Sequence, residues 1–427
     1  MRLEISPDKT GFMRNGRPFF LLSDTAWCAL YNLTESEWRQ YLAIRKRQGF
    51  NAVQLIMLPE QMVELGKEYP FQLLDAATLD FYSLNDSFFE KAERFVRIGA
   101  EEFDMVMMLW LTWSQFIPDT EYANYAKTLV MPLDAIEPYV ERTVRALAPY
   151  VSVFPVCGDT DFNSPAASEA VMRVHRTVKR LAPETLTTLH LYGEHGLNEY
   201  STPIAREADF YMYQSGHRLE GQHSAYTLAQ YFAQLPERKP IMNGEPCYEG
   251  MGMIGRYGRF HRFDVRKAFW QSVLAGASAG IAYGAYGMYT FHRGEGPDRL
   301  IHPFNSPFAW KEAIQFPGAS DYSFGQRLFQ AYQMQQLVPK QELLEEENEE
   351  IRIAASGSND LIVIYVPYSH RLLLKVDFSG YEIEMIELET HRSIEPQWRW
   401  DNGVTNVKMN AVNSDVLIIA KRGACHR

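Results

Sequence analysis

Residues 241–249 read Ile-Met-Asn-Gly-Glu-Pro-Cys-Tyr-Glu, a short apolar run that ends in the carboxylate Glu245 and then in Pro246. Proline has no N–H to donate to a β-ladder and restricts the residue before it, so a strand should end there. In a barrel of parallel strands the carboxyl ends carry the chemistry, which makes Glu245 a candidate nucleophile. Taken alone, the stretch fits an ordinary turn better, so the rest of the chain has to decide.

Strand and helix patterns alternate on both sides of this stretch. Helical patterns cover 34–49, 87–101, 134–149, 167–181, 226–235 and 264–277, and the first begins with a capping box, Thr34 and Glu37. Strand patterns cover 19–22, 51–57, 104–110, 151–157, 186–190, 209–215, 241–245 and 280–284. After the first strand, each strand except the sixth follows a helical pattern. This alternation predicts a parallel sheet closed into a (β/α)₈ barrel.

The two ends of the chain have different patterns. Arg14-Asn15-Gly16-Arg17 predicts an opening β-hairpin. After the eighth strand come a long aromatic loop, 286–320, a last helix near 324–338 and an acidic segment, 341–350. Short β-rich runs separated by turns follow, which predicts a small all-β sandwich. The expected domains are therefore a barrel over 1–340 and a β-sandwich over 341–427.

Composition and charge exclude several classes of protein. The net charge is −11 with no basic stripe, which argues against a nucleic-acid partner. The N-terminus lacks the apolar segment of a signal peptide, and no apolar run approaches the roughly 18 residues of a membrane span. The four cysteines have no paired spacing, as expected for reduced thiols. We therefore predict a cytoplasmic protein without a membrane partner.

Polar, acidic and aromatic residues gather at the predicted carboxyl ends of the strands. Sugar hydrolysis needs two carboxylates, groups that bind hydroxyls, and aromatic rings that stack on sugar faces. We predict Asp159, after the fourth strand, and Glu245, after the seventh, as the catalytic pair, with a carbohydrate as the substrate. The predicted substrate-binding residues are Asp24, Trp27, Gln54, Trp110, Trp113, Asp161, His190, Tyr213, Gln214, His217, Glu249 and Tyr283.

The two carboxylates have different expected roles. In a retaining mechanism Glu245 attacks the anomeric carbon, while Asp159 protonates the leaving oxygen and later activates water. Asp161 is the rival acid, two residues further on the same side of an extended segment. Asp159 is favoured because it follows Gly158 directly at the strand end.

Several motifs together resemble the apiosidase-like glycoside hydrolases. They are GRPFFLLSDTAW, GFNAVQLIML, VCGD, PIMNGEPCYE, GIAYGAYG and, from Trp310, WKEAIQFPGA. The resemblance reaches to about residue 340 and implies a (β/α)₈ barrel, often followed by a β-sandwich. It also implies an acid at the Gly-Asp turn and a nucleophile at the Glu-Pro turn, here Asp159 and Glu245. The family's characterised activity acts on apiose-containing pectin side chains. Two departures are Cys157-Gly158, where the family has a double glycine, and the absence of a signal peptide.

Other functions have weaker support in the sequence. Gly250-Met-Gly252-Met-Ile-Gly255 matches the dinucleotide pattern, but it does not lie between the first strand and helix of a Rossmann unit, so we predict no cofactor. No His-x-x-x-His helix or other ligand spacing occurs, so we predict no metal site and disfavour a metal-dependent hydrolase. The alternative to a glycosidase is a non-catalytic carbohydrate-binding barrel, which has no need of an acid pair.

Overall fold

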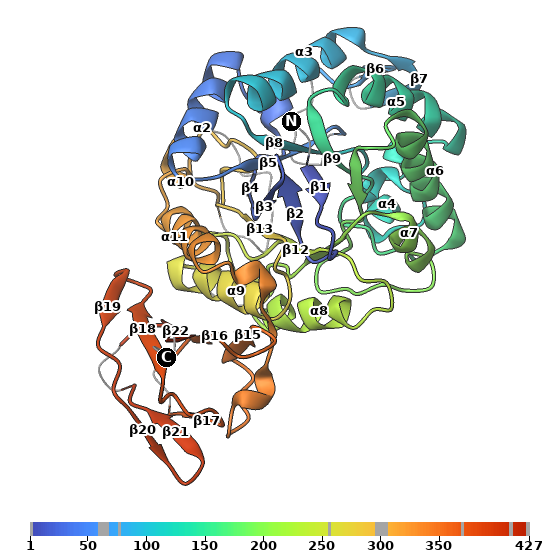
Figure 1. Ribbon diagram of the computed structural model, residues 1–427. Helices are drawn as coiled ribbons and strands as arrows, with labels where there is room; N and C mark the ends of the chain where they lie inside the picture. The colour runs from blue at the N-terminus through green and yellow to red at the C-terminus, as the bar shows by residue number, and fades with distance from the viewer. Residues whose placement is uncertain are drawn as a thin grey trace.

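The protein is described by a computed structural model that covers residues 3–58, 68–75, 78–254, 258–294, 306–368, 371–409 and 413–423. Figure 1 shows a ring of helices around a central barrel, with a separate β-domain beside α9. Within these ranges, no helix is both long enough and apolar enough to cross a membrane.

The barrel sheet has eight strands in the order β10-β9-β8-β5-β4-β13-β12-β11, and every pair in it is parallel. Its strands are β4 (Leu21–Thr25), β5 (Ala52–Ile56), β8 (Val106–Trp110), β9 (Val151–Pro155), β10 (Leu186–Thr188), β11 (Tyr211–Gln214), β12 (Ile241–Glu245) and β13 (Gly280–Tyr283). The predicted (β/α)₈ barrel is confirmed, although the ladder is open between β10 and β11.

Helices cover the outside of this sheet. They are α2 (Glu35–Arg47), α3 (Asp86–Arg97), α5 (Leu133–Leu147), α6 (Pro165–Leu181), α7 (Thr202–Glu207), α8 (Ser224–Ala233), α9 (Arg262–Leu274) and α11 (Gly318–Ala331). The Thr34 hydroxyl accepts a hydrogen bond from Glu37 N, and the Glu37 side chain accepts one from Thr34 N, as the capping box predicted.

Two expectations about helices were wrong. The sixth strand does follow a helix, α7, whose six residues are too few to show a helical period. The last helix lies at Gly318–Ala331 rather than 324–338. Its start was missed because Gly318 and Gly325 lower the helix propensity of this part of the sequence. The expected aromatic loop also contains the short helix α10 (Trp310–Ala313), and residues 295–305 of that loop lie outside the described residues.

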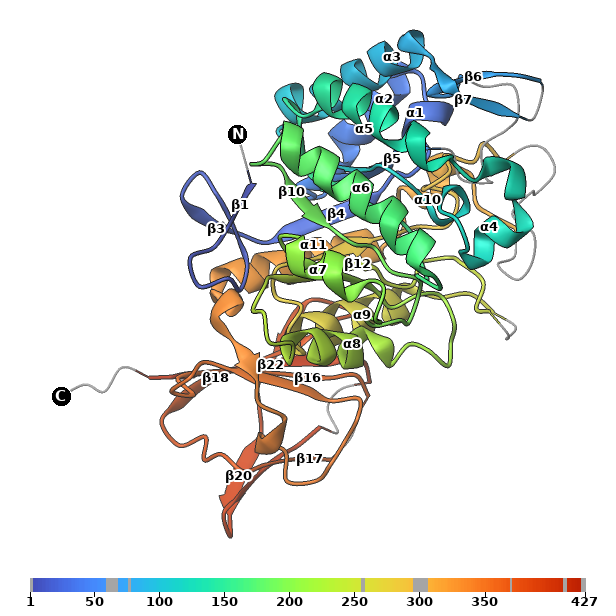
Figure 2. The ribbon, with the colours of Figure 1, turned by 90° about the vertical axis from the view of Figure 1, so that its right-hand side faces the viewer.

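A three-stranded sheet covers the bottom of the barrel, where the strands begin. It consists of β1 (Leu3–Ile5), β2 (Phe12–Arg14) and β3 (Arg17–Phe19), and positive φ angles at Asn15 and Gly16 confirm the predicted hairpin turn. Phe12 packs edge-on against Phe210, which directly precedes β11. Figure 2 shows this sheet at one end of the barrel and α4 (Glu121–Tyr125) with β6 (Phe71–Leu73) and β7 (Leu79–Leu84) at the other.

The C-terminal domain is the predicted β-sandwich. Its larger antiparallel sheet has the strands β14 (Val338–Pro339), β15 (Arg352–Ala355), β16 (Leu361–Val366), β18 (Tyr381–Glu387), β19 (Arg392–Ile394) and β22 (Val416–Arg422). Its smaller sheet has β17 (Leu372–Leu374), β20 (Trp398–Asp401) and β21 (Val404–Val407). Residues alternate along β16, so that Ile362 and Ile364 join the sandwich core while Val363 and Tyr365 join the core of the barrel.

Buried ion pairs lock the β-domain to the barrel. Arg266 of α9 donates from Nε and Nη2 to Asp415, which precedes β22, and from Nη1 to Asp321 of α11 at 2.8 Å. Both aspartate side chains have no exposed surface. His391 Nε2 lies 2.9 Å from Asp321 Oδ1 and joins the same group. This network connects the β-domain to α9, the helix that follows the strand of Glu245.

Candidate active site

Glu245 reaches the mouth of the barrel through an irregularity in β12. Two residues earlier, Asn243 Nδ2 donates to Ser272 Oγ of α9 at 3.0 Å, so Asn243 faces the helix layer. Regular alternation would direct Glu245 to the same side. The register with β11 instead shifts, so that Tyr213 pairs with Asn243 and Gln214 with Glu245. The extra residue in β12 turns the Glu245 carboxylate toward the mouth, which is a common use of a bulge beside active sites.

The Glu245 carboxylate accepts hydrogen bonds on its exposed side. His217 Nε2 lies 3.1 Å from Glu245 Oε1, and the Tyr248 hydroxyl also donates to this carboxylate. Trp27 Nε1 donates in turn to the Tyr248 hydroxyl at 3.0 Å, which orients it. Burial alone would raise the pKa of Glu245, but the hydrogen bonds that the carboxylate accepts, first that from His217, act in the opposite direction, and the pKa lies below its ordinary 4.5. Glu245 is therefore ionised at neutral pH.

His190 lies on the buried side of Glu245. Its side chain has no exposed surface, and its Nε2 is 3.4 Å from Glu245 Oε2. Trp110 Nε1 donates to the other ring nitrogen, Nδ1, at 3.0 Å. Burial holds the pKa of His190 down at about 4, so the ring is neutral at neutral pH.

Asp159 faces Glu245 from the loop after β9. Its backbone has a φ of 46°, a left-handed conformation that aspartate tolerates better than most residues. Gln214 Nε2 donates to Asp159 Oδ1 at 3.0 Å. At Gly158, a Cβ atom would lie 2.3 Å from the Trp113 ring, so the turn requires glycine at this position. A carboxylate oxygen of Asp159, one of Glu245 and a ring nitrogen of His190 all lie within 4.8 Å of one another.

A cavity of about 140 Å³ opens above these two carboxylates. Six of the predicted site residues line it: Trp27, Trp113, Asp159, Gln214, His217 and Glu245. The prediction missed Tyr122, Tyr192, Gly193, Glu194, Gly216, Arg218, Tyr248, Met251, Ile254 and Tyr289, which also line it. Tyr248 follows Glu245 within the stretch that decides the chemistry, and that proximity was the available signal. Tyr122 lies in the short helix α4 and Tyr289 follows β13, and neither segment carries a comparable signal in the sequence.

Several predicted substrate-binding residues do not line this cavity. Asp24 is fully buried, where Arg45 Nε and the Tyr41 hydroxyl donate to its Oδ2 at 2.7 and 2.6 Å. Gln54 is also fully buried and donates from Nε2 to the Gly244 carbonyl oxygen at 3.2 Å. Both residues therefore support the barrel interior and are not placed to touch a substrate.

The remaining misplaced predictions have structural partners of their own. The Tyr213 hydroxyl donates to the Ala225 carbonyl oxygen at 2.7 Å, outside the barrel. The Tyr283 hydroxyl donates to Glu249 Oε2 at 2.6 Å, and Gly318 N donates to the same oxygen. Glu249 thereby ties the loop after β12 to the first turn of α11. Trp110 and His190 are buried beneath the cavity, where they act on Glu245 rather than on a substrate.

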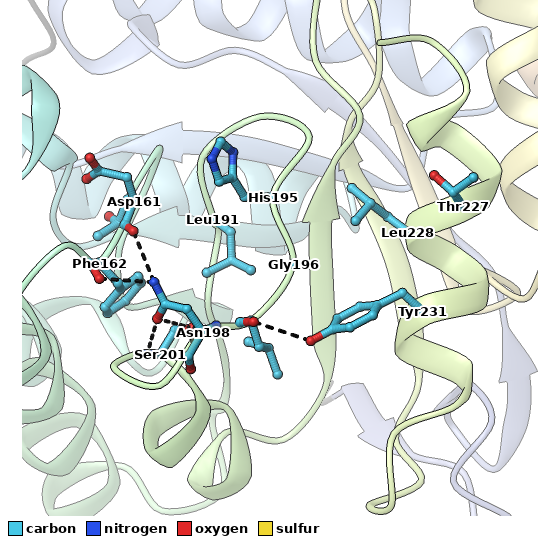
Figure 3. Close-up of a pocket in the computed structure, with 12 residues that line it drawn as sticks. Asp161, Phe162, Leu191, His195, Gly196, Asn198, Ser201, Thr227, Leu228 and Tyr231 are labelled. Atoms are coloured by element: carbon cyan, nitrogen blue, oxygen red, sulfur yellow. Dashed lines mark hydrogen bonds between the residues drawn. The ribbon is translucent and has the colours of Figure 1, made fainter.

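Asp161 belongs to a different pocket, shown in Figure 3. Glu121 N and Asn163 Nδ2 donate to its carboxylate, away from Glu245. The pocket measures about 500 Å³ and lies between the loops after β9 and β10 and helix α8. At this pocket the side-chain amide of Asn198 donates hydrogen bonds to the backbone oxygens of Asp161 and Phe162 (Figure 3). The choice of Asp159 over Asp161 as the partner of Glu245 agrees with this geometry.

The comparisons with known proteins identify the family. A model of the "Apiosidase-like, catalytic domain" matches residues 8–336. The chain belongs to the apiosidase-like family. It is a glycoside hydrolase, as the resemblance of its motifs implied. The search of curated proteins found no match.

Two solved structures share the fold over nearly the whole chain. One is described as a glycoside hydrolase, with a TM-score of 0.79, 18% identity, and coverage of 99% of this chain and 97% of that chain. The other is a family 5 glycoside hydrolase from Bacteroides vulgatus ATCC 8482, with a TM-score of 0.79, 18% identity, and coverage of 99% and 93%. The β-domain is thus included in the likeness to both.

Proposed function

We propose that this glycoside hydrolase works with retention of anomeric configuration, with Glu245 as the nucleophile and Asp159 as the acid/base. Glu245, ionised and held by His217 and Tyr248, attacks the anomeric carbon and forms a glycosyl-enzyme. Asp159 protonates the leaving oxygen and then activates the water that releases the sugar. Gln214 orients the Asp159 carboxyl group in both steps.

The separation of the two carboxylates carries this proposal. Retaining glycosidases hold their carboxyl groups about 5–5.5 Å apart, whereas inverting enzymes leave about 6.5–9.5 Å for a water molecule. A carboxylate oxygen of Asp159 and one of Glu245 lie within 4.8 Å of one another, which is nearer to the retaining separation than to the inverting one. Direct attack by Glu245 on the sugar is therefore favoured over attack by water.

The shape of the cavity supports a small glycoside or oligosaccharide, of plant or other origin, as the substrate. Aromatic side chains, among them Trp27, Trp113 and Tyr289, line the cavity, and aromatic rings can stack on the faces of a sugar. Glu194 and Arg218 at the rim add polar groups that can bind hydroxyls. We propose the cytoplasm as the place of action, because the cysteines among the described residues form no disulfide.

The test is the configuration of the first product, followed by NMR with an aryl glycoside before the sugar mutarotates. Retention is expected for the wild type. Glu245→Gly should lose at least about 100-fold in rate, and added azide should yield a glycosyl azide of inverted configuration. Asp161→Asn is the matched control and should keep nearly full activity. An inverted wild-type product would refute the assigned roles, and binding without turnover would favour a non-catalytic carbohydrate-binding barrel.

A further inference from the structure

Trp110 was expected to stack on sugar, but it is buried at the end of β8 and contacts His190 instead. The geometry points to Trp110 as a positioning residue that keeps His190 neutral with its proton on Nε2, so that Glu245 faces an N–H group and receives no proton. This inference rests on the proposed role of Glu245 as the nucleophile. It assigns to Trp110 a function that acts entirely through His190.

The argument begins with the indole N–H, which can only donate a hydrogen bond. Trp110 Nε1 lies 3.0 Å from His190 Nδ1, so Nδ1 must present its lone pair and cannot carry a proton. A neutral imidazole has one proton, which then resides on Nε2. A doubly protonated ring would place two N–H groups against each other at this contact. Trp110 therefore selects both the charge and the tautomer of His190.

The proton on Nε2 faces the nucleophile. His190 Nε2 lies 3.4 Å from Glu245 Oε2, and among the described residues neither atom has a hydrogen-bond partner. The rings of Trp27, Trp110 and Trp113 surround the imidazole, with centroids 6.2, 5.6 and 5.9 Å away. An imidazolium here would form an ion pair with Glu245 or protonate it, and either outcome would weaken the nucleophile.

The same constraint bears on metal binding. By distance alone, Asp159, His190 and Glu245 could hold a metal ion. A histidine ligand binds through the lone pair of an unprotonated nitrogen. Because Trp110 occupies the lone pair of Nδ1, the nitrogen that faces Glu245 carries the proton and is a donor. The three groups are thus arranged for hydrogen bonding to a carboxylate rather than for metal ligation.

The direct test is NMR of the protein labelled with ¹⁵N-histidine, with His190 assigned by its loss in His190→Asn. Two-bond correlations distinguish Nδ1–H from Nε2–H without any substrate, so the result is independent of the glycosidase proposal. We expect the Nε2–H tautomer from pH 5 to pH 8. A wild-type signal of Nδ1–H or of a doubly protonated ring at pH 7 would overturn the inference.

The variant Trp110→Phe keeps the aromatic packing and removes the donor. The charged or titratable groups that face His190 are Glu245, His217 and Asp159, and without the Trp110 donor the ring can take up a second proton beside them. The pKa of His190 should rise from about 4 by up to about one unit, because the donor that opposes a proton on Nδ1 is gone while the burial of the ring remains. At pH 5 up to about half of the molecules would then carry the imidazolium, so the ratio of kcat/KM at pH 5 to that at pH 8 should fall by up to about 2-fold.

Trp38→Phe is the matched control for this variant. Trp38 is fully buried and donates from Nε1 to the Phe95 carbonyl oxygen at 2.9 Å. The Trp38→Phe variant therefore also loses one indole hydrogen bond, but in the helix layer. It should leave the His190 titration and the pH profile unchanged. An unchanged His190 titration in Trp110→Phe, or an equal shift in Trp38→Phe, would show that Trp110 does not control His190.

Discussion

Removal of the hydrogen bond from His217 to Glu245 should shift the acid side of the pH–activity profile. The variant His217→Phe keeps a ring of similar size, so the contact with Tyr248, whose ring centroid is 4.6 Å away, is preserved. It loses the nitrogen that lies 3.1 Å from Glu245 Oε1. The folded protein should therefore differ mainly in how well the charge of Glu245 is stabilised.

The size of the shift follows from the strength of that hydrogen bond. A hydrogen bond to a charged group contributes about 1.5–3 kcal/mol, and one pKa unit corresponds to about 1.36 kcal/mol. The pKa of Glu245, below 4.5 in the wild type, should therefore rise by about 1–2 units. The tyrosine hydroxyl still donates to the carboxylate, which favours the lower end of this range.

The sign follows from the role of Glu245. Attack on the sugar requires the ionised carboxylate, so activity is lost as the pH falls through its pKa. The acid limb of kcat/KM reports the pKa of the free enzyme, so it should move to higher pH by the same amount, about 1–2 units. The assay is kcat/KM from pH 3.5 to pH 8, with circular dichroism at each pH to verify that the protein stays folded.

His223→Asn serves as the control for this variant. His223 is exposed at the start of α8, where its Nδ1 lies 2.9 Å from the Glu220 carbonyl oxygen, and it does not line the cavity. Its profile should match that of the wild type. An acid limb that stays in place in His217→Phe, with normal folding, would refute the argument that His217 stabilises the charge of Glu245.

Two further predictions concern packing around the site. Arg266→Met should lower the free energy of unfolding in urea by about 3–5 kcal/mol, because Asp321 and Asp415 remain buried with one partner fewer. A loss no larger than that of an exposed arginine variant would contradict this. Gly158→Ala places a Cβ 2.3 Å from the Trp113 ring, which should cost about 1–3 kcal/mol and push the ring into the cavity. Steady-state kinetics should then show KM raised more than kcat is lowered, and unchanged KM would count against the clash.

The amino-acid sequence by itself determined the architecture and singled out the two carboxylates that we propose as the acid pair. Eight alternating strand and helix patterns are local periodicities that repeat along the chain, and the barrel follows from them. Asp159 and Glu245 were recognisable because each stands at a strand end marked by a glycine or a proline. The hairpin at Asn15 and the capping box at Thr34 are equally local, and both were confirmed.

The tertiary structure decided which neighbouring polar residues reach the cavity. Asp24, Trp110 and Tyr213 lie in strands near their carboxyl ends, yet each is turned toward a buried partner. Side chains alternate between the two faces of a strand, so the direction of a residue depends on register and on bulges such as the one directly before Glu245. Register arises from contacts between segments far apart in the chain, and no local pattern records it.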